Sequence, residues 1–172
     1  MMTVTTHVER TDRVEQGRLA DLYARHAPAA SRLAYLLTGD PHLADDLTQE
    51  AFVRAFGRFR DLRQPEAFEW YLRRTVVNLT RSHFRRRRTE REYLARQPRR
   101  EASAPEHDPG ERDAMWATLQ QLAPKQRTAI VLRYYEDLSD AQVADAMQCP
   151  VGTVKSLIHR GLERLRAEVT QA

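Results

Sequence analysis

The side chains with the clearest chemistry lie near the carboxyl end of the chain, on a helix expected from Val151 to about Arg166. Its apolar positions recur at steps of three and four residues: Val151, Val154, Ile158, Gly161 and Leu165. The other face is left with hydroxyl, imidazole and cationic groups: Thr153, Lys155, Ser156, His159 and Arg160. Such groups can reach base edges and phosphates in a DNA major groove. The spacing predicts a DNA-contacting helix, and the alternative is an ordinary solvated amphipathic helix.

A second short helix is expected just before this one. Ser139 stands where a helix cap belongs, and Gln142, three residues later, completes a capping-box pattern, so the helix begins at Asp140. Pro150 cannot continue that helix but fits the opening turn of the next. Two short helices around a tight turn, the second of them basic, are the layout of a helix-turn-helix.

An arginine-rich helix is expected from Glu66 to about Arg88. Between Glu66 and Arg91, eight arginines stand against three glutamates, an excess of five positive charges where the whole chain has four. Helical periodicity buries Phe68, Leu72, Thr75, Val76 and Leu79. It leaves outside Trp70, Arg74, Asn78, Arg81 and Arg85. Cations beside aromatic rings are typical of surfaces that hold single-stranded nucleic acid. We expect the Trp70 ring on the surface, whereas the position of Tyr71 is equally compatible with burial and with stacking on a base.

An acidic patch is expected on a helix that begins near Pro41, opposite its apolar face. It consists of Asp45, Asp46, Gln49, Glu50 and Val53, and the sequence shows no neighbouring cation. A solvated helix face is the simplest interpretation. Catalysis by paired carboxylates would need a pocket and usually a metal, neither of which is evident. The apolar rim makes the patch suited to docking a basic partner helix.

The whole chain of 172 residues predicts an all-α protein made of two small helical domains joined by a flexible linker. We expect a loose amino terminus over residues 1–17, a first domain over 18–92, a linker over 93–112 and a second domain over 113–170. The stretch from Gln97 to Asp113 has three prolines and no large apolar side chain, so it cannot bury enough surface to become ordered. In the helix opened by Pro124, the side chains of Ala129, Ile130, Leu132 and Tyr134 are expected to pack on the helix-turn-helix.

Composition excludes several classes of protein. Cys149 is the only cysteine, so the chain can form neither an intramolecular disulfide nor a cysteine zinc cluster. The sequence shows no signal peptide and no membrane-spanning run, which favours a cytoplasmic protein. It also lacks a phosphate-binding glycine loop, a nucleophile motif and metal-ligand spacing, so we expect no catalysis, no cofactor and no metal.

Three segments together resemble a known family. DDLTQEAF is followed by FEWYLRRTVVNLTRSHFRRR and, after the linker, by LAPKQRTAIVLRYYEDLSDAQVADAMQCPVGTVKS. In this order they are similar to bacterial sigma-70 family transcription initiation factors of the short extracytoplasmic-function type. The resemblance spans about Asp21 to Arg166. It implies a region 2 domain and a region 4 domain, with a linker between them.

The resemblance also implies roles for the surfaces. Asp46 and Gln49 match positions that dock on the clamp helices of the RNA polymerase large subunit, so the acidic patch would bind polymerase. Asn78, with Arg74 and Arg81 and the other outward residues of its helix, would face the −10 element of a promoter. The run from Gly152 to Ser156 matches the helix that reads the −35 element. Region 4 would also meet the polymerase flap, and an anti-sigma factor is an expected partner.

Two other functions fit parts of the sequence. One is a helix-turn-helix repressor or activator that works without polymerase, but it would need an effector pocket or a dimerising helix, and neither is seen. The other is a helical enzyme acting on nucleic acid, with His26, His83, Asp45 and Asp46 as metal ligands. His26 is expected in a core stripe, and no two of these residues have the spacing of a ligand pair.

Overall fold

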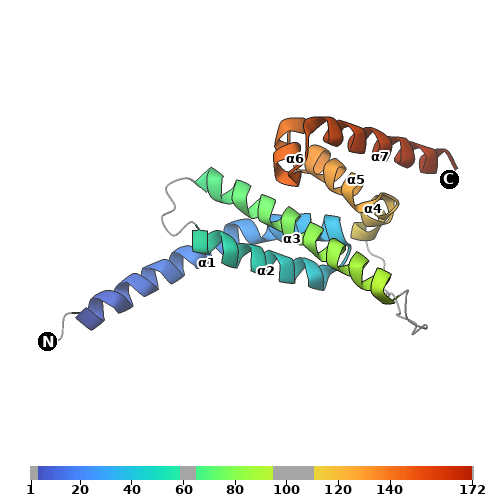
Figure 1. Ribbon diagram of the computed structural model, residues 1–172. Coiled ribbons are helices and arrows are strands. Elements are labelled where there is room, and N and C mark those ends of the chain that lie inside the picture. Colours follow the sequence, from blue (N-terminus) through green and yellow to red (C-terminus); the bar gives the residue numbers. More distant parts are fainter. Residues whose placement is uncertain (1–3, 59–64, 95–110, 172) are drawn as a thin grey trace.

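The computed structural model describes residues 4–58, 65–94 and 111–171, and all regular structure within these ranges is helical. The elements are α1 (Val4–Thr38), α2 (Pro41–Arg58), α3 (Pro65–Leu94), α4 (Glu111–Gln120), α5 (Pro124–Ile130), the π-helix η1 (Val131–Tyr135), α6 (Asp140–Met147) and α7 (Val151–Gln171). Figure 1 shows α1 to α3 lying together and α4 to α7 grouped beside them. The all-α class expected from the sequence is confirmed.

Helices α1, α2 and α3 form the first domain. Their shared core includes Leu33, Leu37, Phe52, Phe68 and Val76, all nearly inaccessible to solvent. A short turn at Gly39 and Asp40 joins α1 and α2. Gly39 has a φ of +74°, and the Asp40 carboxylate accepts a hydrogen bond of 3.0 Å from the Leu43 amide, which caps α2.

Helices α5, α6 and α7 form the second domain, with η1 between α5 and α6. The capping box is present, since the Gln142 amide donates to Ser139 Oγ and the Ser139 amide donates to Gln142 Oε1. Helix α6 ends at Gln148, a left-handed residue with φ of 53°, and α7 starts three residues later. Val143 and Val154 are fully buried where α6 and α7 meet. The predicted helix-turn-helix is therefore confirmed as a fold.

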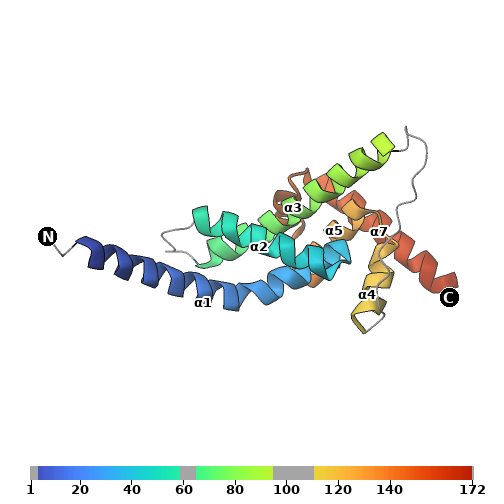
Figure 2. The same ribbon diagram turned by 90° about the horizontal axis from the view of Figure 1, so that it is seen from below.

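Element ends differ from the expectation in three places. Residues expected to be loose before Gly17 belong to α1, which begins at Val4 and extends past the other helices in Figures 1 and 2. No proline precedes Gly17, and a helix that has formed adds one hydrogen bond for each residue it gains. Helix α3 continues beyond Arg88 to Leu94, and α4 begins at Glu111, inside the expected linker. The rest of that linker lies outside the described residues.

Two side chains expected in the core are exposed. Tyr134 is 59% exposed because it lies in η1, whose π-helical turn shifts the phase of the apolar face so that Val131 and Leu132 are buried instead. Val151 is 40% exposed because it is the first residue of α7, ahead of the turn that packs on α6. Residues further along the predicted α7 stripe follow the expectation, since Val154 and Ile158 are buried.

The two domains pack against each other, whereas the sequence suggested only a flexible connection. Helix α3 contacts α6, and α1 contacts α5 and η1. Figure 2 shows α3 crossing in front of the second domain. Within the described ranges, no helix is both long enough and apolar enough to cross a membrane.

Candidate nucleic-acid and protein-binding sites

The acidic face of α2, defined as Asp45, Asp46, Gln49, Glu50 and Val53, is exposed along its whole length. Val53 is 75% exposed, while Thr48, Ala51 and Phe52 beneath it are buried. The small and aromatic side chains of α2 recur every three to four residues and are buried, so the carboxylates on the opposite side of the helix point to solvent. The sequence placed these five residues together on one surface, and the structure places them there too.

The partners of the acidic face are local. Ser31 Oγ donates a hydrogen bond of 2.9 Å to Asp45 Oδ1, and Arg54 pairs with Glu50 one turn earlier on α2. The expectation that no cation neighbours the patch is therefore wrong at Arg54. Its position four residues after Glu50 could have signalled the pair. Asp46 and Gln49 make no hydrogen bond or ion pair within the described part of the chain, so they remain available to a partner.

A cavity of about 360 Å³, here called the α3 pocket, opens between the ends of α2 and α3. Its lining residues are Arg54, Arg58, Tyr71, Arg74, Thr75, Asn78 and Gln148. The Arg58 guanidinium lies 5.6 Å from the centre of the Tyr71 ring, so cations and an aromatic face share one concave surface. Arg54 and Arg58 were not among the predicted site residues, although their spacing on α2 puts them on one side of that helix.

Asn78 lines the α3 pocket and has a side-chain oxygen without a partner. Its Oδ1 atom is buried and accepts no hydrogen bond from any described residue. A buried acceptor left unpaired is costly, and a donor that reaches it removes that cost. The amino groups of nucleobases are such donors. Cations for phosphate, a ring for stacking and an unpaired amide oxygen together suit an unstacked nucleotide.

The other predicted residues of α3 lie in different surroundings. Trp70, expected on the surface, and Tyr71 are both half-buried and pack against the core, and Tyr71 also lines the α3 pocket. Both lie at the edge of the apolar stripe, where a side chain is neither fully buried nor fully exposed. Arg85 is exposed. Arg74 and Arg81 both face the second domain, through Asp145 for Arg74 and the Met147 carbonyl for Arg81.

The predicted face of α7 is fully open. All five of its residues are exposed: Thr153, Lys155, Ser156, His159 and Arg160. Ser156 Oγ donates to the Gly152 carbonyl at 3.1 Å, and His159 Nε2 lies 3.3 Å from a carboxylate oxygen of Glu163. These contacts stay within α7. The face is therefore a convex surface, the shape that enters a major groove.

The histidines proposed as metal ligands lie apart. The half-buried His26 ring lies 5.6 Å from the Phe68 ring, as expected for a core position. Burial, with the nearby Arg87 and Arg86, lowers the pKa of His83. Among the described residues, no group of three or more histidine, cysteine, aspartate or glutamate side chains could hold a metal ion.

Comparison with known proteins finds family matches in two parts of the chain. Residues 22–90 match the family described as Sigma-70 region 2, and residues 112–165 match Sigma-70, region 4. The chain is 38% identical to RNA polymerase sigma-E factor of Streptomyces coelicolor, over 82% of this chain and 80% of that protein. It is 30% identical to ECF RNA polymerase sigma factor SigW of Bacillus subtilis, over 98% and 97% of the two chains.

Solved structures agree on the fold. The sigma factor RpoE, crystallised with the anti-sigma factor NepR from Bartonella quintana, gives a TM-score of 0.67 at 24% identity. That match covers 86% of this chain and 94% of RpoE. CnrH, solved in complex with the cytosolic domain of CnrY, gives a TM-score of 0.61 at 27% identity, over 91% of this chain and 90% of CnrH.

Proposed function

This chain belongs to the sigma-70 family of transcription initiation factors, in its extracytoplasmic-function type, and we propose which of its surfaces performs each part of promoter selection. The protein directs RNA polymerase to promoters, and it binds both the polymerase core and promoter DNA. Sigma factors are not enzymes, so the chemistry of RNA synthesis belongs to the polymerase. The work of this chain is recognition and the stabilisation of opened DNA.

The acidic face of α2 is the surface for the polymerase core. Asp46 and Gln49 are exposed and unpaired within the described residues, and Val53 adds an apolar contact in the same patch. A basic helical surface such as the clamp helices of the large subunit complements this arrangement. The region 4 domain takes a second contact, with the polymerase flap.

The α3 pocket is the surface for the −10 element. Its cations, its ring and the unpaired Asn78 Oδ1 support binding of a base that has left the stack. A protein that binds only the unstacked form shifts the equilibrium towards open DNA. Promoter opening then needs no nucleotide hydrolysis by this chain. Trp70, half-buried, has a packing role, and Tyr71 takes the stacking role instead.

The open face of α7 is the surface for the −35 element. Thr153, Lys155 and Ser156 on its first turns reach bases and phosphates, with His159 and Arg160 one turn later. Duplex recognition needs no pocket, only an exposed helix. This agrees with the exposure of all five residues.

Two further assignments follow from the family. The site of action is where polymerase and promoters are, in the cytoplasm on the nucleoid. An anti-sigma factor is a partner, as NepR is for RpoE in the structure that resembles this one.

The proposal is carried by one observation: an exposed acidic face, a pocket for single bases and an exposed recognition helix occur in one chain. Run-off transcription with purified core polymerase on a promoter library tests it directly. We expect transcripts from a small set of promoters only when this protein is present. Equal transcription with and without the protein would overturn the assignment.

A further inference from the structure

We propose that Arg58 and Arg54, near the carboxyl end of α2, hold the phosphate of the nucleotide that the α3 pocket receives. The inference rests on the proposed function of the α3 pocket and names the residues that bind the DNA backbone there. Helix α2 then serves two partners, because its acidic face binds polymerase and its last two turns bind the DNA strand.

The charge of the α3 pocket indicates an anionic ligand. Three of its lining residues are arginines, Arg54, Arg58 and Arg74, and none of the described lining residues is an aspartate or a glutamate. A guanidinium group can bind a phosphate through two parallel hydrogen bonds, which makes arginine a common phosphate ligand. A cavity of about 360 Å³ walled by these cations therefore suits a phosphate together with the base attached to it.

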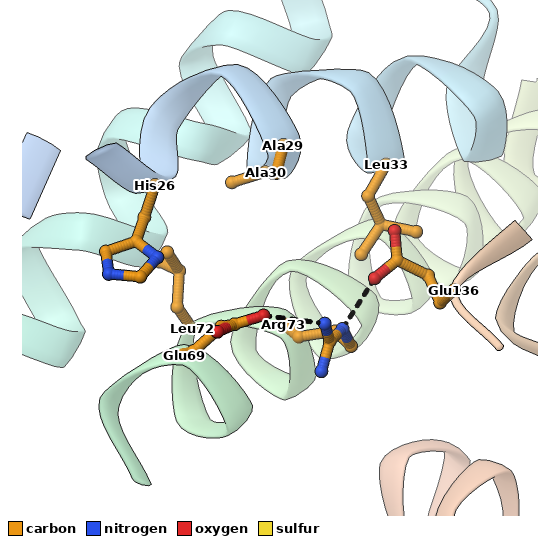
Figure 3. A pocket seen from close by; sticks show the side chains of 8 residues that line it. All are labelled: His26, Ala29, Ala30, Leu33, Glu69, Leu72, Arg73 and Glu136. Atoms are coloured by element: carbon orange, nitrogen blue, oxygen red, sulfur yellow. Dashed lines mark hydrogen bonds and ion pairs between the residues drawn. The ribbon is translucent and has the colours of Figure 1, made fainter. Parts of the chain in front are cut away.

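A second cavity, of about 40 Å³, has the opposite balance of charge and provides a contrast. Figure 3 shows its lining residue Arg73 between the carboxylates of Glu69 and Glu136. Arg73 Nη2 donates a hydrogen bond of 3.0 Å to Glu69, and Arg73 Nε donates one of 2.6 Å to Glu136. One arginine neutralised by two carboxylates does not attract phosphate. The excess of arginine over carboxylate is thus a property of the α3 pocket and not of both cavities.

Arg58 is the cation of the α3 pocket best placed for phosphate. Its guanidinium lies 5.6 Å from the centre of the Tyr71 ring, beside the ring proposed to stack a base. It is exposed and forms no ion pair with a described residue, whereas Arg74 Nη1 lies 3.6 Å from Asp145 Oδ2. A nucleotide stacked on Tyr71 therefore has its phosphate within reach of a cation whose charge is not neutralised by a described carboxylate.

Arg54 supplies a second cation, one turn before Arg58. It pairs with Glu50 of the acidic face, and the two side chains are 55% and 49% exposed. An exposed ion pair of this kind contributes little free energy, so a phosphate can replace Glu50 as the partner of Arg54. The contact from Arg54 is the weaker of the two, because strand binding costs this residue its pair with Glu50.

The local structure of α2 explains why both arginines lie on one surface. Positions 54 and 58 are one helical turn apart, so their side chains are neighbours. Ala51 and Ala55 are fully buried and hold the other side of the helix in the core. Arg58 lies in the last turn of α2, where the helix dipole stabilises a cation. The two charges are therefore stable at the pocket before any strand binds.

The test uses holoenzyme assembled from core polymerase and the full chain. The probe is a fluorescent single-stranded DNA that carries the −10 non-template sequence of a promoter identified by run-off transcription. In a series of probes, one phosphate at a time is replaced by an uncharged methylphosphonate. Fluorescence anisotropy measures the affinity of each probe over a salt series.

Three variants are compared with wild type. Arg58→Ala and Arg54→Ala each remove one cation from the α3 pocket. Arg25→Ala removes the same charge from an exposed position of α1 that is not among the lining residues, so it serves as the matched control. Circular dichroism and co-elution with core polymerase check that each variant is folded and assembled.

Arg58→Ala should bind the unmodified strand about fivefold more weakly than wild type, and its affinity should depend less on salt, with a logarithmic slope lower by about 0.7. Wild type should lose a similar factor at one modified linkage. Arg58→Ala should lose nothing further at that linkage, since both changes remove the same contact. Arg54→Ala should lose about twofold, and Arg25→Ala should match wild type on every probe.

Other outcomes separate this inference from the proposed function. Equal affinities of wild type and Arg58→Ala on every probe would overturn the inference and leave the role of the α3 pocket standing. A loss for Arg58→Ala that adds to the loss at every modified linkage would also overturn it, because Arg58 would then act on the Tyr71 ring and not on a phosphate. Strand binding by wild-type holoenzyme no tighter than by core polymerase alone would overturn the role of the α3 pocket itself.

Discussion

Helices α3 and α7 are both basic and both assigned to promoter DNA, yet the structure treats them differently. The outward residues of α7, Lys155 among them, are exposed, and the contacts of Ser156 and His159 stay within their own helix. Of the outward residues of α3, Arg74 and Asn78 line a pocket, and Arg74 and Arg81 are engaged by the other domain. The same kind of sequence pattern thus gives one open face and one covered face.

The difference fits the form of DNA that each helix is proposed to meet. A duplex presents its base edges in a groove, so a single exposed helix is enough to read it. An unstacked base must be enclosed and given stacking and hydrogen-bond partners, which requires walls from more than one helix. A pocket built from two helices can also be covered by a third element, as Gln148 does here.

The largest expected effect is the loss of polymerase binding. A variant that no longer binds polymerase allows α3 and α7 to be compared by their own binding to DNA. Asp46→Arg puts a cation on the acidic face of α2, where it would meet a basic docking surface. We expect a loss of core binding of about 100-fold or more, because like charges at an interface cost several kcal/mol. Co-elution with purified core polymerase measures this. Asp21→Arg should co-elute as wild type does, and unchanged co-elution of Asp46→Arg would contradict the assignment.

The next effect concerns the α3 pocket alone. Asn78→Ala removes the unpaired amide oxygen, so we expect promoter opening to fall by about tenfold or more while closed-complex formation is nearly unchanged. The free energy of unfolding should not fall, because the lost atom has no partner among the described residues. Permanganate footprinting measures opening. Gln120→Ala, which removes an exposed amide on α4, should leave the footprint as it is.

A smaller effect concerns the α7 face. Lys155→Ala should weaken binding to promoter duplex and make the logarithm of the affinity about one unit less steep against the logarithm of salt concentration, since one phosphate contact is lost. Fluorescence anisotropy over a salt series measures the slope. Lys125→Ala removes the same charge from an exposed position of α5 that is not one of the five residues of this face, and it should keep the wild-type slope. An unchanged slope for Lys155→Ala would remove Lys155 from the contacts.

The smallest effect tests the scaffold that holds α7. Ser139→Ala removes one half of the capping box of α6, and we expect a loss of about 1 kcal/mol in the stability of the second domain. Denaturant unfolding followed by circular dichroism measures it. Duplex binding by the folded protein should be unaffected. A variant as stable as wild type would show that the Ser139 side chain does not stabilise the helix.

Much of each site could be predicted because helical periodicity decides which side chains share a face. It placed the five acidic-face residues and the five α7 residues on exposed surfaces, and all ten are exposed. It was less accurate at the edge of a stripe, where Trp70, expected on the surface, is half-buried. It also failed at Tyr134, because a π-helical turn changes the phase and leaves no simple mark in the sequence.

The sequence alone determined the family, the helical class, the cap at Ser139 and the separation of an acidic face from two basic helices. These depend on interactions between residues a few positions apart, so local chemistry decides them. The tertiary structure alone decided that Arg54 and Arg58 join Tyr71 and Asn78 around one pocket, and that Glu136, Asp145 and the end of α6 neutralise the arginines of α3. These contacts join residues that are far apart in the sequence. Arg73 and Glu136, for example, are more than sixty positions apart. Local periodicity does not specify such contacts.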